Sequence, residues 1–260
     1  MNRGAIIVLM CAASANAQQK FSAPLAGIAR DSHQQLRVVH GLSGTFIWHD
    51  LIGENVVDWA FDGNGGLVKT NTELLTIGAN GAIAGRRSAP QQKAVLGPQS
   101  AFFPETHELW QTAQNGVTKV SIEPEMIAGS VIALGPARGR RVQLAVCRAS
   151  ILWQLTIDTT NGSVTQELAP GGAIGEKACL PSRGASLVLL ADRMLLATAH
   201  AVLVQTAAGI ERSIPISASH AARAGEQWIE VESATGPAHM VRITSDPEKT
   251  YQLPAAKELP

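Results

Sequence analysis

Several short segments carry residue types that bind metals or catalyse reactions in other proteins. The segment His107-Glu108-Leu109-Trp110-Gln111 begins like the zinc-protease helix motif, in which two histidines four residues apart hold the metal. Gln111 stands where the second histidine would be, so one of the two imidazole ligands is missing. We therefore expect this segment to lie on a strand, with His107 and Glu108 facing solvent.

Other catalytic and ligand-binding motifs are also incomplete. Segment 171–177 has the glycines and the lysine of a phosphate-binding loop, but Glu176 separates them and no serine or threonine follows. We expect it to connect two structural units. Segment 62–66 begins like a calcium loop but lacks the closing glutamate, which favours a β-turn. No Gly-x-Ser-x-Gly nucleophile elbow occurs, so the sequence predicts no catalytic residue.

The first residues of the chain are typical of a secretory signal peptide. Arg3 precedes an apolar run over 5–10, and the small residues Ala15-Asn16-Ala17 form a cleavage site before Gln18. The alternative is a lipoprotein anchor on Cys11, which the bulky Met10 disfavours. The sequence therefore predicts an exported protein, periplasmic or extracellular, with a signal peptide over 1–17.

Two cysteines remain beyond this segment, and they leave two alternatives open. Cys147 and Cys179 are 32 residues apart, and a disulfide between them would contribute roughly 3 kcal/mol of stability. They could equally be two buried thiols, because sequence does not show whether their Cβ atoms meet. Neither has a cysteine or histidine close in sequence, so no thiolate metal site is predicted.

Composition narrows the classes of partner. The 260 residues contain 21 basic and 21 acidic side chains, and loss of Arg3 leaves a net charge of −1. No basic stripe is present, which argues against nucleic acid and anionic membranes as partners. No segment after residue 17 reaches 18 uninterrupted apolar residues, so no transmembrane segment is expected. We expect a monomer that binds a protein or a carbohydrate.

The tryptophans are the best candidates for ligand contact. Trp110 and Trp153 occupy equivalent places in two repeated units, which favours packing between units over a carbohydrate- or peptide-binding platform. Trp48 lies outside the repeat and is the better candidate for a surface role.

The elements that carry these residues are short apolar strands joined by tight turns. The turn glycines Gly81, Gly116, Gly162 and Gly209 lie 35, 46 and 47 residues apart, a period typical of repeated units. Five units of four strands are expected, over 56–84, 93–122, 131–168, 187–214 and 218–253. Segment 25–39 is expected to supply only the two outer strands of a sixth. Either segment 44–51 adds an irregular strand to that unit, or the ring closes in an unconventional way. Segment 186–208 is also compatible with a buried helix, although the neighbouring units favour strands.

The step Trp59-Ala60-Phe61-Asp62-Gly63 resembles the bacterial β-propeller superfamily of the YVTN, NHL and WD40-like kind. In that superfamily an apolar strand ending in Phe, followed by Asp-x-x-Gly, commonly links inner strands. The resemblance implies an all-β propeller of about six four-stranded blades, one of them incomplete or irregular, over 18–254. Residues 255–260 would form a C-terminal tail. A pair of β-sandwiches is the alternative architecture.

The resemblance also bears on activity. Lactonase-type propellers hold calcium or zinc in the central channel, and Glu54, Asn55 and Asp58 form the only local cluster of that character. A channel site needs ligands from several blades, so no metal, cofactor or cofactor-binding residue is assigned. The expectation is an exported, non-catalytic binding or structural module. The alternative is an exported propeller enzyme, lactonase-like or quinoprotein-like, with a metal or cofactor in the channel.

Overall fold

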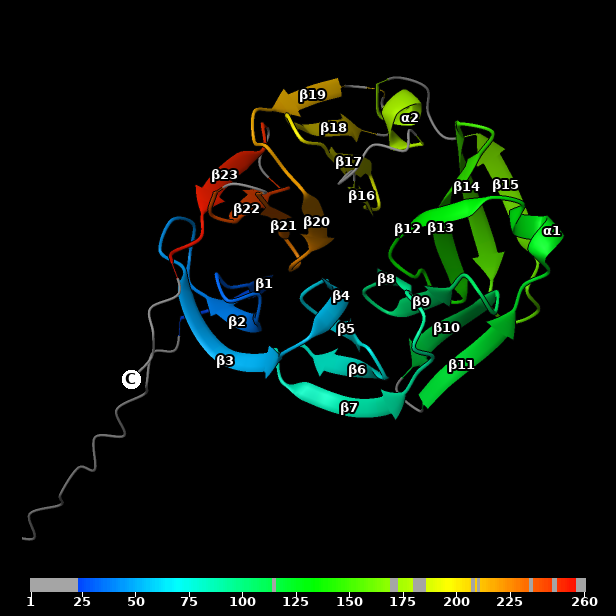
Figure 1. Ribbon diagram of the computed structural model, residues 1–260, viewed down its shortest axis with the longest axis horizontal. Coiled ribbons are helices and arrows are strands. Elements are labelled where there is room, and N and C mark those ends of the chain that lie inside the picture. The colour runs from blue at the N-terminus through cyan, green and yellow to red at the C-terminus, as the bar shows by residue number, and fades with distance from the viewer. Residues whose placement is uncertain are drawn as a thin grey trace, which may run out of the picture.

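The computed structural model describes residues 23–113, 116–168, 173–179, 186–206, 209, 211–233, 236–244 and 247–255. In this part of the chain, antiparallel sheets follow one another around a central axis, as Figure 1 shows. Each sheet is built from strands consecutive in sequence, and its first strand lies nearest the axis. The prediction of an all-β propeller with six blades is confirmed.

The strands group into blades in chain order. The first blade contains β1 (Leu25–Arg30), β2 (Leu36–His40) and β3 (Ile47–Gly53). The second contains β4 (Val56–Phe61), β5 (Gly65–Thr70), β6 (Glu73–Gly78) and β7 (Ile83–Ser88). The third contains β8 (Val95–Gly97), β9 (Ser100–Phe103), β10 (Glu108–Ala113) and β11 (Gly116–Ser121).

The remaining three blades have four strands each. The fourth contains β12 (Ser130–Leu134), β13 (Arg141–Arg148), β14 (Ile151–Asp158) and β15 (Val164–Leu168). The fifth contains β16 (Ser186–Leu189), β17 (Arg193–Ala197), β18 (Val202–Thr206) and β19 (Glu211–Ile214). The sixth contains β20 (His220–Arg223), β21 (Trp228–Glu232), β22 (His239–Arg242) and β23 (Lys249–Gln252).

The turn glycines have the backbone conformation that their repeated position predicts. Gly81, Gly116, Gly162 and Gly209 all have positive φ angles, of 80°, 136°, 72° and 77°. Residues other than glycine rarely adopt positive φ angles, so these glycines permit tight connections between the two outer strands of a blade.

The apolar segment 186–206 folds as the strands β16, β17 and β18 and not as a helix. Its near-continuous apolar character follows from its place in the ring. The strands of a blade pack against neighbouring blades on both faces, so both sets of alternating side chains are buried. Val188 and Leu195 belong to the core shared with the sixth blade, whereas Leu187 and Leu196 belong to the core shared with the fourth.

Two short helices interrupt the strands, and neither is predicted from the sequence. They are α1 (Pro124–Ile127) and α2 (Ala173–Ala178). Residues 173–177 lie on the connection between the fourth and fifth blades, as the sequence predicts, but they fold there as a helix; 171 and 172 lie outside the described residues. The helix forms because Ile174 and Ala178 bury themselves against the core between the fourth and fifth blades. No helix of the described residues is long and apolar enough to cross a membrane.

The first blade differs from the others in having three strands in the described chain. Its strand β1 lies against the end of β20, because the Ile28 N–H donates to the Ala224 carbonyl at 2.9 Å. A Cβ on Gly27 would lie 2.0 Å from that same oxygen, so only glycine permits this approach. The sequence predicts two strands over 25–39 and offers segment 44–51 as an irregular third, and the third strand is β3.

The channel is consequently lined by five strands in the described chain, not six. They are β4, β8, β12, β16 and β20, the first strands of the other blades. Strand β20 is next to β4 around the channel, while β1 takes the position of a second strand. We call the place where β1, β4, β20 and β21 meet the ring junction.

Candidate functional site at the ring junction

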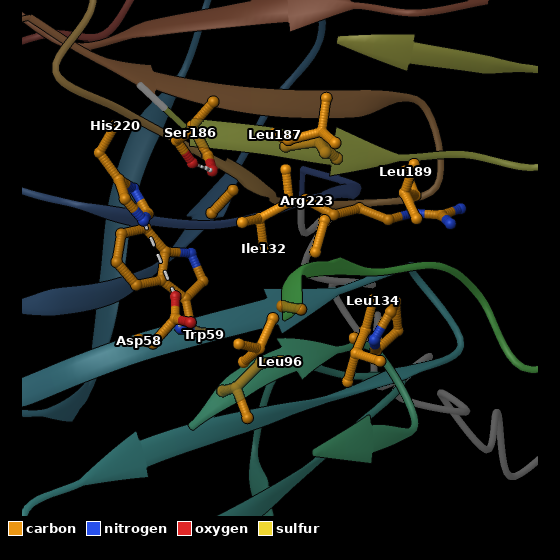
Figure 2. Close-up of a pocket in the computed structure, with 18 residues that line it drawn as sticks. Asp58, Trp59, Leu96, Ile132, Leu134, Ser186, Leu187, Leu189, His220 and Arg223 are labelled. Atoms are coloured by element: carbon orange, nitrogen blue, oxygen red, sulfur yellow. Dashed lines mark hydrogen bonds and ion pairs between the residues drawn. The ribbon is translucent and has the colours of Figure 1, made fainter. Parts of the chain in front are cut away.

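The central channel is narrow, and most of the residues that line it are of apolar type. It encloses a cavity of about 60 Å³, and Figure 2 shows side chains of all five lining strands around it. A cavity of this size has room for ordered water molecules. The apolar lining includes Leu96, Ile132, Leu134, Leu187 and Leu189.

Polar side chains gather at one mouth of the channel. His220 Nε2 lies 3.8 Å from Asp58 Oδ1, and its Nδ1 lies 3.8 Å from Glu232 Oε1. The imidazole also packs on the indole of Trp59, with 5.3 Å between ring centroids. Figure 2 shows His220 and Asp58 at this end and the Arg223 guanidinium at the other. The first residues of β4 and β20 thus bring an acid and a base together.

The surroundings shift both groups toward their neutral forms. Burial raises the pKa of Asp58 from 3.8 to about 7, although its hydrogen bond to the Trp59 N–H and the charges of Lys93 and Arg30 oppose the shift. Burial lowers the pKa of His220 from 6.5 to about 4, and the same two cations add to that shift. At neutral pH the imidazole is uncharged and Asp58 exchanges between its two forms.

Arg30 connects three strands of the ring junction. From the end of β1, its Nη1 donates to Glu232 Oε1 on β21 at 3.2 Å. Its Nη2 donates to the Val56 carbonyl at the start of β4 at 2.6 Å. The guanidinium carbon also lies 4.4 Å from the centroid of the Trp59 ring, within range of a cation–π contact. One side chain thus joins the first, second and sixth blades.

Glu230 satisfies the free edge of β1. This residue is fully buried, and its Oε1 accepts the backbone N–H of Arg30 at 2.7 Å. In a four-stranded blade, an inner strand would supply that acceptor. Burial, and then the nearby charge of Glu232, raise the pKa of Glu230 well above its usual value. The Glu230 carboxyl therefore supplies the hydrogen-bond acceptor that a missing strand would provide at this point.

We call Arg30, Asp58, His220, Glu230 and Glu232 the junction cluster; its Asp58 has the titration behaviour of a general acid or base and lies beside a cavity of about 60 Å³. A carboxyl group with a pKa near 7 is suited to proton transfer at neutral pH. Small-molecule sites usually occupy about 300–1,000 Å³, several times the cavity beside Asp58. The hydrogen bonds of the cluster connect the first blade to the second and sixth blades.

Two larger clefts open at the ring junction, one on each side. The first, which we call the junction cleft, has a volume of about 350 Å³ and is lined by residues that include Arg30, Gln34, Trp48, Glu232, Pro237 and Gln252. The half-buried Trp48 donates from its Nε1 to the Pro254 carbonyl at 2.9 Å, which orients the indole. The second cleft, of about 510 Å³, includes Leu42, Trp228 and Arg242.

The other residues singled out by sequence have different environments. Trp110 is buried against Phe103, with 4.7 Å between rings, and donates to Glu108. Trp153 is half-buried, with the Arg148 guanidinium 5.8 Å from its ring. Both therefore contribute to packing.

The cluster considered for a channel metal does not assemble. Glu54 and Asn55 are exposed on the connection between β3 and β4, where Glu54 accepts from Gln35, while Asp58 faces His220. In the ranges that the structure describes, no three His, Cys, Asp or Glu side chains converge as metal ligands.

Cys147 and Cys179 are joined by a disulfide bond with Cα atoms 5.4 Å apart. It connects strand β13 to the residue that follows helix α2. Ala17 and Gln18, the expected cleavage site, lie outside the described residues.

Sequence reasoning missed Arg30, His220, Glu230 and Glu232. The acids gave a misleading local signal, because Glu230 and Glu232 alternate with Ile229 and Val231 as on a half-exposed strand, whereas residues 228–231 are buried on both faces. A carboxylate at such a position is either paired or protonated. The partners of Arg30 have no local signal, because Glu230 is 200 residues away in sequence.

The arrangement of the strands defines the chain as a six-bladed β-propeller. No model of a known protein family matches the chain, and no curated protein matches its sequence. Solved propellers resemble it with low identity. The Pan2 WD40 domain of Neurospora crassa aligns over 89% of this chain and 79% of its own, with 10% identity and a TM-score of 0.43.

Two further solved structures are similar to the same degree. The β-propeller domain of Cps50 (Swd1) from Myceliophteria thermophila aligns over 90% of this chain and 88% of its own, with 10% identity and a TM-score of 0.44. PorZ, a surface component of the type-IX secretion system of Porphyromonas gingivalis, aligns over 90% of this chain and 31% of its own, with 12% identity and a TM-score of 0.44. Likenesses this distant concern the arrangement of strands alone.

Proposed function

We propose that the chain is an exported, non-catalytic binding module whose ligand contacts the surface of the ring rather than its channel. The observation that carries the proposal is the contrast in volume between the channel cavity, about 60 Å³, and the junction cleft, about 350 Å³. Only the second lies in the range of sites that hold a small ligand or a short segment of a partner.

The chemistry of the junction cleft supports a peptide or carbohydrate ligand. Trp48 supplies a flat apolar face held in place by its bond to Pro254, and Gln34 and Gln252 supply amide donors and acceptors. Oriented aromatic rings with polar neighbours are common anchors of binding sites. Export is supported by Arg3, the apolar run over 5–10 and the Ala15-Asn16-Ala17 step.

A binding screen with matched tryptophan variants tests the proposed function. The full chain, expressed for export, would be screened on arrays of peptides and glycans beside Trp48→Ala and Trp153→Ala. Loss of a central aromatic anchor costs about 2 kcal/mol or more, so ligands of the junction cleft should be retained by Trp153→Ala and lost by Trp48→Ala. Ligands bound equally by all three proteins, or by none, contradict the proposal.

Two further measurements address export and catalysis. N-terminal sequencing of the protein recovered outside the cytoplasm should begin at Gln18. Elemental analysis, with melting temperatures in EDTA and in calcium, should find no stoichiometric metal and no shift. A bound metal whose removal lowers the melting temperature would favour the channel-enzyme alternative.

A further inference from the structure

A second polar groove lies away from the ring junction, on the fourth blade. It has a volume of about 450 Å³ and lies where β13 begins and β14 ends. Its lining includes Arg138, Arg140, Arg141, Gln143, Thr156 and Asp158. We call it the arginine groove.

The turn that carries the three arginines is held rigidly. Arg138 and Arg141 exchange backbone hydrogen bonds of 2.8 and 3.1 Å, and Gly139 between them has a φ of +61°. The Gly139 carbonyl accepts Gln111 Nε2 of the third blade at 2.8 Å. The Arg140 carbonyl accepts the Thr159 N–H at 2.7 Å. A fixed backbone lowers the entropic cost of binding through these side chains.

The positive charge of the turn is only partly neutralised within the described part of the chain. Arg138 Nη2 donates to the Ala191 carbonyl at 3.3 Å and Arg140 Nη1 to Thr160 Oγ1 at 3.4 Å, both uncharged partners. None of the three arginines has a carboxylate oxygen of a described residue within 4.0 Å. By contrast, described carboxylates lie within that distance of Arg30, Arg37, Arg86, Arg193 and Arg212.

The one acid in the groove leaves an excess of positive charge. Asp158 is opposite Arg141 in the pairing of β13 with β14, and its Oδ1 accepts the Thr160 N–H at 2.8 Å. Three exposed guanidinium groups around this single carboxylate give a local excess of two positive charges. The chain as a whole has a formal net charge of zero, so the excess is local.

We infer that the arginine groove binds an acidic peptide segment of a partner protein. Guanidinium groups match carboxylates in planar, two-bonded geometry, which suits side chains of aspartate and glutamate. Gln143 and Thr156 are directly opposite each other on β13 and β14 and supply hydrogen-bonding groups for a peptide backbone. The inference rests on the proposed binding function but uses a different surface.

Fluorescence anisotropy tests the inference with a labelled peptide of alternating glutamate and glycine, and with its glutamine counterpart. The full-length exported chain should bind the acidic peptide and not the neutral one. Arg140→Gln with Arg141→Gln should weaken binding by about tenfold or more, about 1.4 kcal/mol. The matched control is Arg86→Gln with Arg87→Gln, which removes the same charge from exposed positions on β7 and should change affinity by less than about twofold.

Several outcomes would overturn the inference. These are absence of binding to the wild-type chain, equal losses in both double variants, and displacement of the peptide by inorganic phosphate at the same concentration as by free acidic peptide. The last would assign a simple anion site. Circular dichroism and melting temperature would establish that each variant is folded. Trp48→Ala should leave acidic-peptide binding unchanged, so failure here and failure at the junction cleft are distinguishable.

Discussion

At the scale of single residues, burial acts in opposite directions on Asp58 and His220. A buried environment favours the neutral form of each, so it raises the pKa of the acid and lowers that of the base. Near neutral pH the imidazole is uncharged and Asp58 is only partly ionised, so their 3.8 Å contact is not a full ion pair. The stability of the ring should reflect both titrations.

The pH dependence of Asp58→Asn measures the first of them. Between pH 3.8 and about 7 the folded protein retains a proton on Asp58 that the unfolded chain releases, so this residue lowers stability as pH rises. The variant cannot titrate. Its free energy of unfolding relative to wild type should therefore increase from pH 4 to about pH 7 and then level off, as measured by urea denaturation.

His220→Gln is the matched control with the opposite sign. Between about pH 4 and pH 6.5 the unfolded chain binds a proton on His220 that the folded protein excludes, so this residue raises stability as pH rises. As pH rises from about 4 to 6.5, the free energy of unfolding of the variant should therefore fall relative to that of the wild type. A flat difference for either variant would show that the junction does not bury that group.

At the scale of elements, the ring junction depends on one side chain that completes a strand. Glu230 accepts the Arg30 N–H where a four-stranded blade would offer a carbonyl. Because burial raises the pKa of Glu230 and so favours its neutral form, an amide of the same shape should replace it.

Glu230 variants test this role. The free energy of unfolding of Glu230→Gln should be within about 1 kcal/mol of the wild-type value, because the amide keeps an acceptor for the Arg30 N–H. Glu230→Ala leaves that buried N–H unpaired and should lose about 1–3 kcal/mol, measured by urea denaturation at pH 7. Equal losses in the two variants would indicate that packing, and not the hydrogen bond, is what Glu230 provides.

Whether an element can be predicted from the sequence depends on how far apart in the chain the residues that stabilise it lie. The turn glycines and short apolar strands are local features, and they predict the five four-stranded blades. The helix over 173–178 escapes prediction because tertiary burial of Ile174, and not a local capping pattern, stabilises it. The junction cluster is not predicted from the sequence because its hydrogen bonds join β1 to β21, which are far apart in the chain. The arginine groove is not predicted because the hydrogen bond that fixes its turn comes from Gln111 of another blade.

At the scale of the whole molecule, the disulfide connects parts of the fold that strand pairing does not. It fastens α2, which packs between the fourth and fifth blades, to strand β13. The bond closes a loop of 32 residues, for which the loss of unfolded-chain entropy is roughly 3 kcal/mol.

Cys147→Ser with Cys179→Ser tests that contribution. The double variant should unfold at a lower urea concentration, with a loss of about 2–4 kcal/mol. Adding a reductant should lower the stability of the wild-type chain toward that of the variant and leave the variant unchanged. A wild-type chain insensitive to reductant would contradict the prediction.

The three-stranded first blade has a geometric consequence for the ring. In the described chain the ring consists of six sheets, but only five of them contribute a strand to the lining of the channel. The number of units around the axis therefore differs between the channel and the outer part of the ring. Equal angular spacing cannot satisfy both at once. Strand β20 contacts β4 directly at the ring junction, β1 packs against β21 outside that contact, and the two clefts flank β1.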